Sequence, residues 1–253
     1  MKRIVTAVVL VPLVVAITVY APAWLFDAVV TGFAVLAFDE FLCLPRVRGI
    51  GNPGRWVLPL GAGVVLSFLL GPQWTLAGIA VTLMVVMAAT VFGGELETGL
   101  VRVGTGAAGV VYTCVLPGFL LLLPRDAVLV LLGFTWIGDT AALYGGQALG
   151  RHLLAPQVSP KKTIEGSVLG LAASLTVGLF LGSWLLGKEP RAFILIVLIT
   201  TLAGQLGDLA ESLLKRSAGV KDSSSILPGH GGILDRLDSL FFSAPVFYWL
   251  LKL

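Results

Sequence analysis

Residues 166–187, GSVLGLAASLTVGLFLGSWLLG, contain no charged side chain. A helix needs about 20 apolar residues to cross about 30 Å of hydrocarbon, and this stretch is long enough. Inside a bilayer the backbone polar groups must find partners within the protein, so a spanning segment of this length should be helical. The stretch therefore predicts a transmembrane helix.

Eight further apolar runs accompany this one. Of the 253 residues, 57% are hydrophobic and only 12% are charged, whereas soluble domains are about half apolar and a quarter charged. We therefore expect an all-α, polytopic integral membrane protein with about nine transmembrane helices. The expected spans are residues 4–20, 23–43, 56–71, 73–92, 105–124, 126–148, 166–187, 191–210 and 233–251.

The sequence shows no repeat and no linker that would separate domains. We expect one integrated membrane domain, in which residues 1–125 supply N-terminal transmembrane helices. Residues 126–253 are expected to supply the C-terminal helices that carry the functional site. The formal net charge of +3 is too small to indicate nucleic acid, but it suits contact with an anionic membrane face.

The distribution of lysine and arginine predicts the orientation. With the N-terminus inside, 13 of the 17 cationic residues fall on the inner side and 4 on the outer side. Cytoplasmic loops carry such an excess of cations. We therefore expect a multi-pass protein of the cell's inner membrane, with its N-terminus and its two longest polar loops, 149–165 and 211–232, in the cytoplasm.

The first polar constellation is GQLGDLAESLLKRSAGVKD, residues 204–222. Asp208, Glu211, Ser212 and Lys215 follow the spacing i, i+3, i+4 and i+7, which places them on one face of a helix. A carboxylate at the end of an apolar run is costly, so Asp208 favours a functional site over a charged helix end. For Lys215 and its neighbour Arg216 the two interpretations are equally good.

The second constellation is SSSILPGHGGILDRLDS, residues 223–239. Its glycines allow close approach of the backbone to a ligand, and bare N–H groups suit phosphate. Asp235 and Asp238 open the last apolar helix, where a carboxylate can also serve as a cap. Capping does not explain His230 and Arg236 in the same segment, and we interpret His230 as a phosphate contact.

A metal ion is a natural partner for these carboxylates. Asp208 and Asp235 come from different expected helices and can meet across a hard cation. Carboxylates together with substrate phosphates are the usual arrangement around Mg²⁺.

The third constellation is SPKKTIEG, beginning at Ser159. Lys161 and Lys162 can bind phosphate, and the hydroxyls of Ser159 and Thr163 can add short contacts. Equally, the segment can be a positive-inside anchor with Thr163 as the N-cap of the next helix. Upstream, Asp139 lies within an apolar run, where an acid indicates a functional site.

Three further acids, Asp27, Asp39 and Glu40, lie in or beside the second expected span. We interpret them as structural residues that pair with cations elsewhere in the bundle. Together, the other carboxylates, the cations and the glycine loop predict metal-assisted phosphoryl or nucleotidyl transfer to a lipid at the cytoplasmic face.

The segment from Ser212 to Ser239, SLLKRSAGVKDSSSILPGHGGILDRLDS, resembles the signature of phosphatidate cytidylyltransferases, also called CDP-diacylglycerol synthases. The stretches LAPQVSPKKTIEG and GDTAALYGGQALGRH resemble two further blocks of that family. Ile164 stands where the family usually has tryptophan, and Leu143 and Gln147 stand where it usually has a tyrosine and a basic residue. The resemblance covers roughly residues 135–245 and the overall polytopic layout, and the N-terminal third of the chain matches only in hydropathy.

The resemblance implies that CTP and phosphatidate, the substrates, give CDP-diacylglycerol and pyrophosphate with a divalent cation, usually Mg²⁺. It implies metal ligands Asp208 and Asp235, with Asp139 as a further candidate, and no covalent enzyme intermediate. The expected catalytic residues are Asp208, Lys221, Asp235 and Asp238. The residues expected to hold the substrates are Ser159, Lys161, Lys162, Thr163, Ser212, Lys215, Arg216, Asp222, His230, Gly231, Gly232 and Arg236.

Other functions remain open at this point. A CTP-dependent lipid kinase or an ether-lipid cytidylyltransferase would use the same chemical groups, and a homodimer is compatible with all of these. An ion-coupled transporter would instead use Asp139 and Asp208 along a cation pathway. The mass of the lipid product, or uptake without nucleotide consumption, separates these functions.

Overall fold

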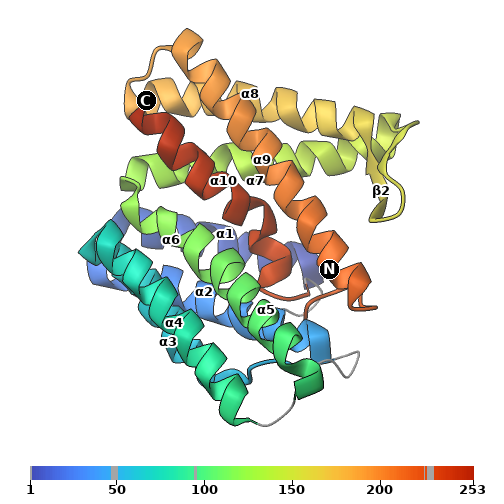
Figure 1. Cartoon of the computed structure of the whole chain (residues 1–253). Helices are drawn as coiled ribbons and strands as arrows, with labels where there is room; N and C mark the ends of the chain where they lie inside the picture. The colour runs from blue at the N-terminus through green and yellow to red at the C-terminus, as the bar shows by residue number, and fades with distance from the viewer. Residues whose placement is uncertain (1, 47–50, 94–95, 225, 227–230) are drawn as a thin grey trace. The chain divides into compact units, whose positions relative to one another are not determined.

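The computed structural model describes residues 2–46, 51–93, 96–224, 226 and 231–253. Helices make up most of these residues (Figure 1). The chain forms two compact units. The first contains Met1–Leu122 and Leu214–Leu237, and the second contains Leu123–Leu213 and Asp238–Leu253.

The first unit begins with α1 (Lys2–Tyr20) and α2 (Ala23–Arg46). Its further elements are η1 (Arg55–Val57), α3 (Leu58–Ser67), η2 (Phe68–Leu70), α4 (Pro72–Phe92), η3 (Leu96–Thr98), α5 (Gly99–Val110), η4 (Val111–Val115), α6 (Leu116–Gly118) and η5 (Phe119–Leu122). The wide turn η4 is a π-helical turn that comes just before Pro117. Because proline has no N–H for the carbonyl of Thr113, the regular ladder is interrupted there.

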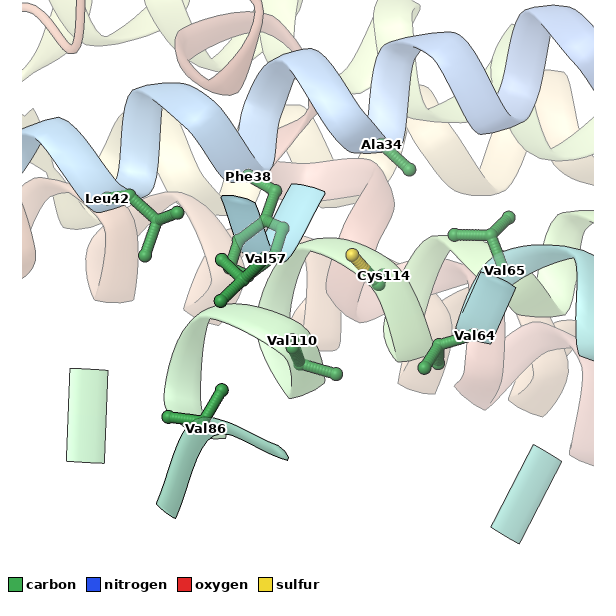
Figure 2. Close-up of a cluster of buried hydrophobic side chains, with 9 residues drawn as sticks. All are labelled: Ala34, Phe38, Leu42, Val57, Val64, Val65, Val86, Val110 and Cys114. Carbon is green, nitrogen blue, oxygen red and sulfur yellow. The ribbon is translucent and has the colours of Figure 1, made fainter. Parts of the chain in front are cut away.

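A cluster of buried side chains holds α2 against α3, α4, α5 and η4 (Figure 2). Phe38 and Leu42 of α2 lie beside Val57, and Val64 and Val65 of α3 lie further along the same cluster. The glycines of α3 and α5 permit this packing, since a Cβ on Gly109 would lie 2.6 Å from the ring of Phe38. The cluster fixes α2, and with it the acids that α2 carries.

The second unit contains α7 (Arg125–Leu149), β1 (Leu153–Ala155), β2 (Ser159–Thr163), α8 (Ile164–Leu186), most of α9 (Pro190–Ser217) and most of α10 (Leu234–Lys252). Helices α7 and α8 lie side by side, with the strands at one end (Figure 1). Small residues bring the two backbones close: a Cβ on Gly138 would collide with Ser174, whose hydroxyl donates to the carbonyl of Phe134 at 2.8 Å.

The two strands form an antiparallel hairpin that pairs Leu153 with Thr163 and Ala155 with Ser159. The sequence predicted an all-α protein with a polar loop at 149–165, and the hairpin is the exception to that expectation. Its strands are too short to bury an apolar face, so hydropathy gives no signal for them. The hairpin joins α7 directly to α8.

Helix α9 continues to Ser217, well into the region 211–232 that was expected to be a polar loop. Lys215 and Arg216 occupy its last turn, where cations suit the helix dipole. Gly219, at φ +78°, then ends the helix. The N–H of Val220 donates to the carbonyl of Lys215, and the N–H of Gly219 to that of Arg216, both at 3.0 Å, which is a Schellman motif.

Five helical segments in the described part of the chain are long and apolar enough to cross a membrane. They are Pro72–Phe92, Leu96–Leu122, Arg125–Leu149, Ile164–Leu186 and Pro190–Ser217. Only 11% of the apolar window of α4 is buried, so its outward side chains suit lipid. The chain is a helical membrane protein. The count of nine spans and the single integrated domain stay predictions.

Candidate active site

In the first unit, the carboxylate of Asp235, in the first turn of α10, contacts the end of α9 and the segment that links the two helices. Its Oδ1 accepts from Nζ of Lys215 at 2.5 Å, and the two side chains are only 6% and 12% exposed. Its Oδ2 accepts from the N–H of Ser223 at 3.0 Å and from the N–H of Gly232 at 2.7 Å. Residues distant along this segment therefore meet at one carboxylate.

A second carboxylate, that of Glu40 on α2, binds the same segment. Its Oε1 accepts from the hydroxyl of Ser224 at 2.6 Å and from the N–H of Ile233 at 3.0 Å. Its Oε2 accepts from the hydroxyl of Ser223 and the N–H of Leu234, both at 2.8 Å. Glu40 is buried, with 2% exposure. The unpaired N–H groups that begin α10 thus find acceptors on Glu40.

The glycines next to α10 are required by this packing. Gly231 has φ +81°, a conformation that L side chains rarely adopt, and a Cβ there would lie 2.5 Å from Oδ2 of Asp235. A Cβ on Gly232 would collide with Ser223 and Glu40. Here the two glycines bring the backbone close to carboxylates of the protein itself.

Other predicted substrate residues of this unit lie on its surface. Arg216, Asp222 and Arg236 are exposed, as is the predicted catalytic residue Lys221. One guanidinium N–H of Arg216 donates to the carbonyl of Val220 at 3.2 Å. Exposed cations of this kind are accessible to a phosphate. The remaining predicted phosphate contact, His230, lies outside the described residues.

In the second unit, Lys162 of β2 forms an ion pair with Asp208 of α9. Both side chains are partly exposed, at 28% and 31%. Lys162 also attracts the carboxylate of Asp139 on α7. The hairpin therefore brings one of the two predicted phosphate-binding lysines next to predicted metal ligands. The other, Lys161, is exposed.

Four carboxylates gather in this unit. The charges of Asp139, Asp208 and Glu211 each oppose a charge on Asp238. Glu211 is buried and Asp139 is exposed, so the group extends from the interior to the surface. Ser212, on the same helix, is half-buried. The spacing read from the sequence is confirmed as a helix, and its acids lie close to those of α7 and α10.

The remaining residues of the third constellation form the start of α8. The hydroxyl of Thr163 accepts from the N–H of Gly166 at 3.1 Å, so Thr163 is the N-cap. Glu165 accepts from the N–H groups of Arg151 and His152 at 3.0 and 3.2 Å. Ser159 is half-buried at the first residue of β2. The capping role was one of the two alternatives for this segment.

The side chains predicted to bind the metal ion can be compared with the ligands that Mg²⁺ requires. In the described part of the chain, no three His, Cys, Asp or Glu side chains are grouped to hold a metal ion. Mg²⁺ is usually held by one or two carboxylates, with water and substrate phosphates as the other ligands. The carboxylate of Asp208, which is 31% exposed, fits that chemistry as a single ligand. The carboxylate of Asp235 is 6% exposed and accepts from Lys215, Ser223 and Gly232, so a metal ion would have to displace one of these donors. Asp208 lies in the second unit and Asp235 in the first.

The sequence interpretation gave Glu40 only a structural role as a partner for a cation. Asp39 does have such a partner, because Arg55 donates to its two carboxylate oxygens at 2.6 and 2.8 Å. Glu40 instead accepts from hydroxyl and backbone N–H groups more than 180 residues away. The one signal in the sequence is an acid within an apolar helix, and it does not identify the partner.

Comparisons with known proteins agree with the signature. The model of the cytidylyltransferase family matches residues 1–253. A phosphatidate cytidylyltransferase of Synechocystis sp. is 31% identical over 287 residues, covering 100% of this chain and 96% of that protein. The protein of the same name from Brucella melitensis is 31% identical over 253 residues, covering 97% and 91%.

Identity is higher over part of the chain. The phosphatidate cytidylyltransferase of Bacillus subtilis is 46% identical over 121 residues, which is 47% of this chain and 44% of that protein. The partial match agrees with the full-length matches to the family model and to the other two relatives. The chain belongs to the cytidylyltransferase family.

Proposed function

We propose that this protein transfers the cytidylyl group of CTP to phosphatidate, giving CDP-diacylglycerol and pyrophosphate. One structural observation carries the proposal. Asp235 of the signature segment, residues 212–239, binds Lys215, Ser223 and Gly232 of the same segment. Four residues of the segment that carries the family resemblance, Lys215, Ser223, Gly232 and Asp235, therefore form one connected polar group in a membrane protein.

The chemistry is a displacement at phosphorus. A phosphate oxygen of phosphatidate attacks the α-phosphorus of CTP and forms the new P–O bond. The bond from the α-phosphorus to the bridging oxygen breaks, and pyrophosphate leaves with that electron pair. The reaction brings the negative charges of phosphatidate and CTP together. The main tasks of the protein are therefore to stabilise this charge and to position the two substrates.

Lysines paired with carboxylates suit these tasks. Lys215 faces Asp235 and Lys162 faces Asp208, so each ammonium group is held in place near a carboxylate. A phosphate that arrives there competes with the carboxylate for the lysine. Exposed Lys161, Arg216, Lys221 and Arg236 add cations for the triphosphate and the lipid phosphate.

The proposed cofactor is Mg²⁺, with Asp208 and Asp235 as ligands and Asp139 as a further candidate. When bound, such an ion neutralises phosphate charge and stabilises the leaving pyrophosphate. Asp238 and Lys221 are the other proposed catalytic residues. Asp238 adds a carboxylate to the group around Asp208.

The membrane arrangement is part of the proposal. Nine spans would leave the N-terminus, residues 149–165 and the signature segment at the cytoplasmic side of the inner membrane. This places the reaction where nucleotide is available and where the lipid headgroup meets water. A homodimer is also proposed, and the mass of the purified particle in detergent tests it.

The proposed activity is tested with purified protein, phosphatidate, CTP and Mg²⁺, followed by mass analysis of the lipids. We expect the mass of CDP-diacylglycerol and release of pyrophosphate. Parallel reactions with diacylglycerol and with an ether-lipid phosphate distinguish a lipid kinase and an ether-lipid enzyme. A product that gained only phosphate, or ion uptake by proteoliposomes without CTP consumption, would contradict the proposal.

A further inference from the structure

Glu40 is a buried acid on a helix whose other buried residues are apolar except for Thr31. Its neighbours Phe38, Phe41 and Leu42 have exposures of 0%, 6% and 1%, and Glu40 itself has 2%. Removing a carboxylate from water costs several kcal/mol unless hydrogen bonds replace the hydration. An acid at this position therefore needs compensating donors.

Those donors all come from residues 223–234. Two are the hydroxyls of Ser223 and Ser224, and two are the N–H groups of Ile233 and Leu234. A carboxylate has about four lone-pair positions, and each oxygen of Glu40 accepts two of these donors. The positive end of the α10 dipole lies at the same place and favours a negative charge.

Glu40 and Asp235 together accept hydrogen bonds from the backbone N–H groups at the start of α10. The N–H of Gly232 donates to Asp235, and the next two N–H groups donate to Glu40. The hydroxyl of Ser223 lies 2.8 Å from Oε2 of Glu40 and 3.0 Å from Oδ2 of Asp235. A shift of Glu40 would therefore move groups that also hold Asp235.

We propose that Glu40 of α2 is a positioning residue for the reaction: it holds Ser223, Ser224 and the start of α10 against α2 so that Asp235 and Lys215 keep their geometry. The inference rests on the proposed function, because Asp235 is assigned a role in that reaction. Glu40 itself needs no contact with substrate. The apolar cluster around Phe38 and Leu42 fixes α2 and gives Glu40 a rigid support.

The main variant is Glu40→Gln, which keeps the size of the side chain. One oxygen becomes an NH₂ group, so two of the four donors would face another donor. We expect kcat to fall roughly 10–100-fold, as for residues that orient a catalytic shell. KM for CTP should change less, because the loss falls on geometry needed in the transition state.

The matched control is Asp39→Asn, the same kind of substitution at the adjacent residue. Asp39 binds exposed Arg55 rather than the segment 223–234. We expect its kcat to stay within about twofold of wild type, since exposed ion pairs contribute little.

Hydrogen–deuterium exchange in detergent gives a readout that does not depend on activity. In Glu40→Gln, amide exchange should rise in peptides covering 231–236 and stay unchanged in peptides of α3. If the wild-type protein makes no CDP-diacylglycerol but exchange at 231–236 still rises in Glu40→Gln, the proposed function is wrong. The structural contact between Glu40 and the start of α10 is then still supported. A uniform rise across α2 to α4 would show a general structural role and overturn the positioning role.

If Glu40→Gln does not fold, Ser224→Ala replaces it, since this removes one donor to Glu40 and leaves Asp235 intact. We expect a smaller, roughly threefold to tenfold fall in kcat, because only one of the four donors to Glu40 is lost. A kcat within twofold of wild type in every variant that folds would overturn the proposal.

Discussion

Lys215 Nζ lies 2.5 Å from Oδ1 of Asp235, in an ion pair that is nearly buried. Breaking such a pair by removing one charge leaves the other without compensation, which costs about 3–5 kcal/mol. The pair therefore has a structural role in addition to its proposed catalytic one. Both roles can be tested with substitutions that keep side-chain shape.

Asp235→Asn should lower the rate of CDP-diacylglycerol formation roughly 10²–10³-fold per folded molecule, the loss typical of one electrostatic catalytic group. It should also lower the unfolding temperature in detergent, because Lys215 loses its partner. The control is Asp126→Asn, which removes an exposed charge from the first turn of α7. Turnover near the wild-type value, with normal expression, would remove Asp235 from the reaction.

The two adjacent lysines of β2 should differ in effect. Lys162 is paired with Asp208, whereas Lys161 is exposed. Lys162→Ala should raise KM for CTP roughly tenfold or more, since a hydrogen bond from a charged group contributes about 1.5–3 kcal/mol. Lys161→Ala should have a smaller effect. Steady-state kinetics per inserted molecule provides the measurement, and equal effects of the two variants would contradict this ranking.

Removing divalent cations should abolish activity, and adding Mg²⁺ back should restore it. If Asp208 is a ligand, Asp208→Asn should raise the Mg²⁺ concentration that gives half-maximal rate, by roughly tenfold or more. The Mg²⁺ titration of Asp126→Asn should match that of wild type. An unchanged titration for Asp208→Asn would argue that this carboxylate serves only Lys162.

The orientation predicted from the cations can be tested by cysteine labelling. Cys43 and Cys114 are first replaced, and single cysteines are placed at Gln157 and Glu189. Gln157 lies in the exposed turn of the hairpin and should react only when the inner face is accessible. Glu189 lies on the predicted outer side and should react in intact cells. The opposite pattern would reverse the topology.

Hydropathy is sufficient to predict a helical membrane protein, because spanning segments must satisfy their own backbone groups. The face shared by Asp208 and Glu211 also followed from helical spacing alone. Hydropathy alone ended this span at residue 210, whereas α9 continues to Ser217 through a polar last turn with Lys215 and Arg216, as the helical spacing up to Lys215 had indicated. Polar helical turns beyond a span need capping signals to be recognised.

The role of Glu40 could not be predicted from the sequence in the same way. Its donors lie more than 180 residues away, and two of them are backbone N–H groups, which carry no sequence signal. Likewise, the partner of Lys162 depends on a hairpin that has no apolar pattern. Local patterns predict which residues are polar and functional, but the pairing of those residues depends on tertiary packing.

The close packing of α7 against α8 provides a last test, which concerns stability. A methyl group on Gly138 would collide with Ser174, whose hydroxyl donates to the carbonyl of Phe134. Gly138→Ala should therefore destabilise the protein by about 1–3 kcal/mol, the usual cost of overpacking. It should also lower activity indirectly, because Asp139 is the next residue on α7.

Gly63 on α3 is the matched control, because a Cβ there would meet nothing within 4 Å. Gly63→Ala should be neutral or stabilising by up to about 1 kcal/mol, since alanine favours helix over glycine. Thermal unfolding in the same detergent compares the two variants. If Gly138→Ala were as stable as Gly63→Ala, the contact between α7 and α8 would be loose enough to accommodate an added methyl group. The close approach that holds Asp139 beside Lys162 would then not be rigid.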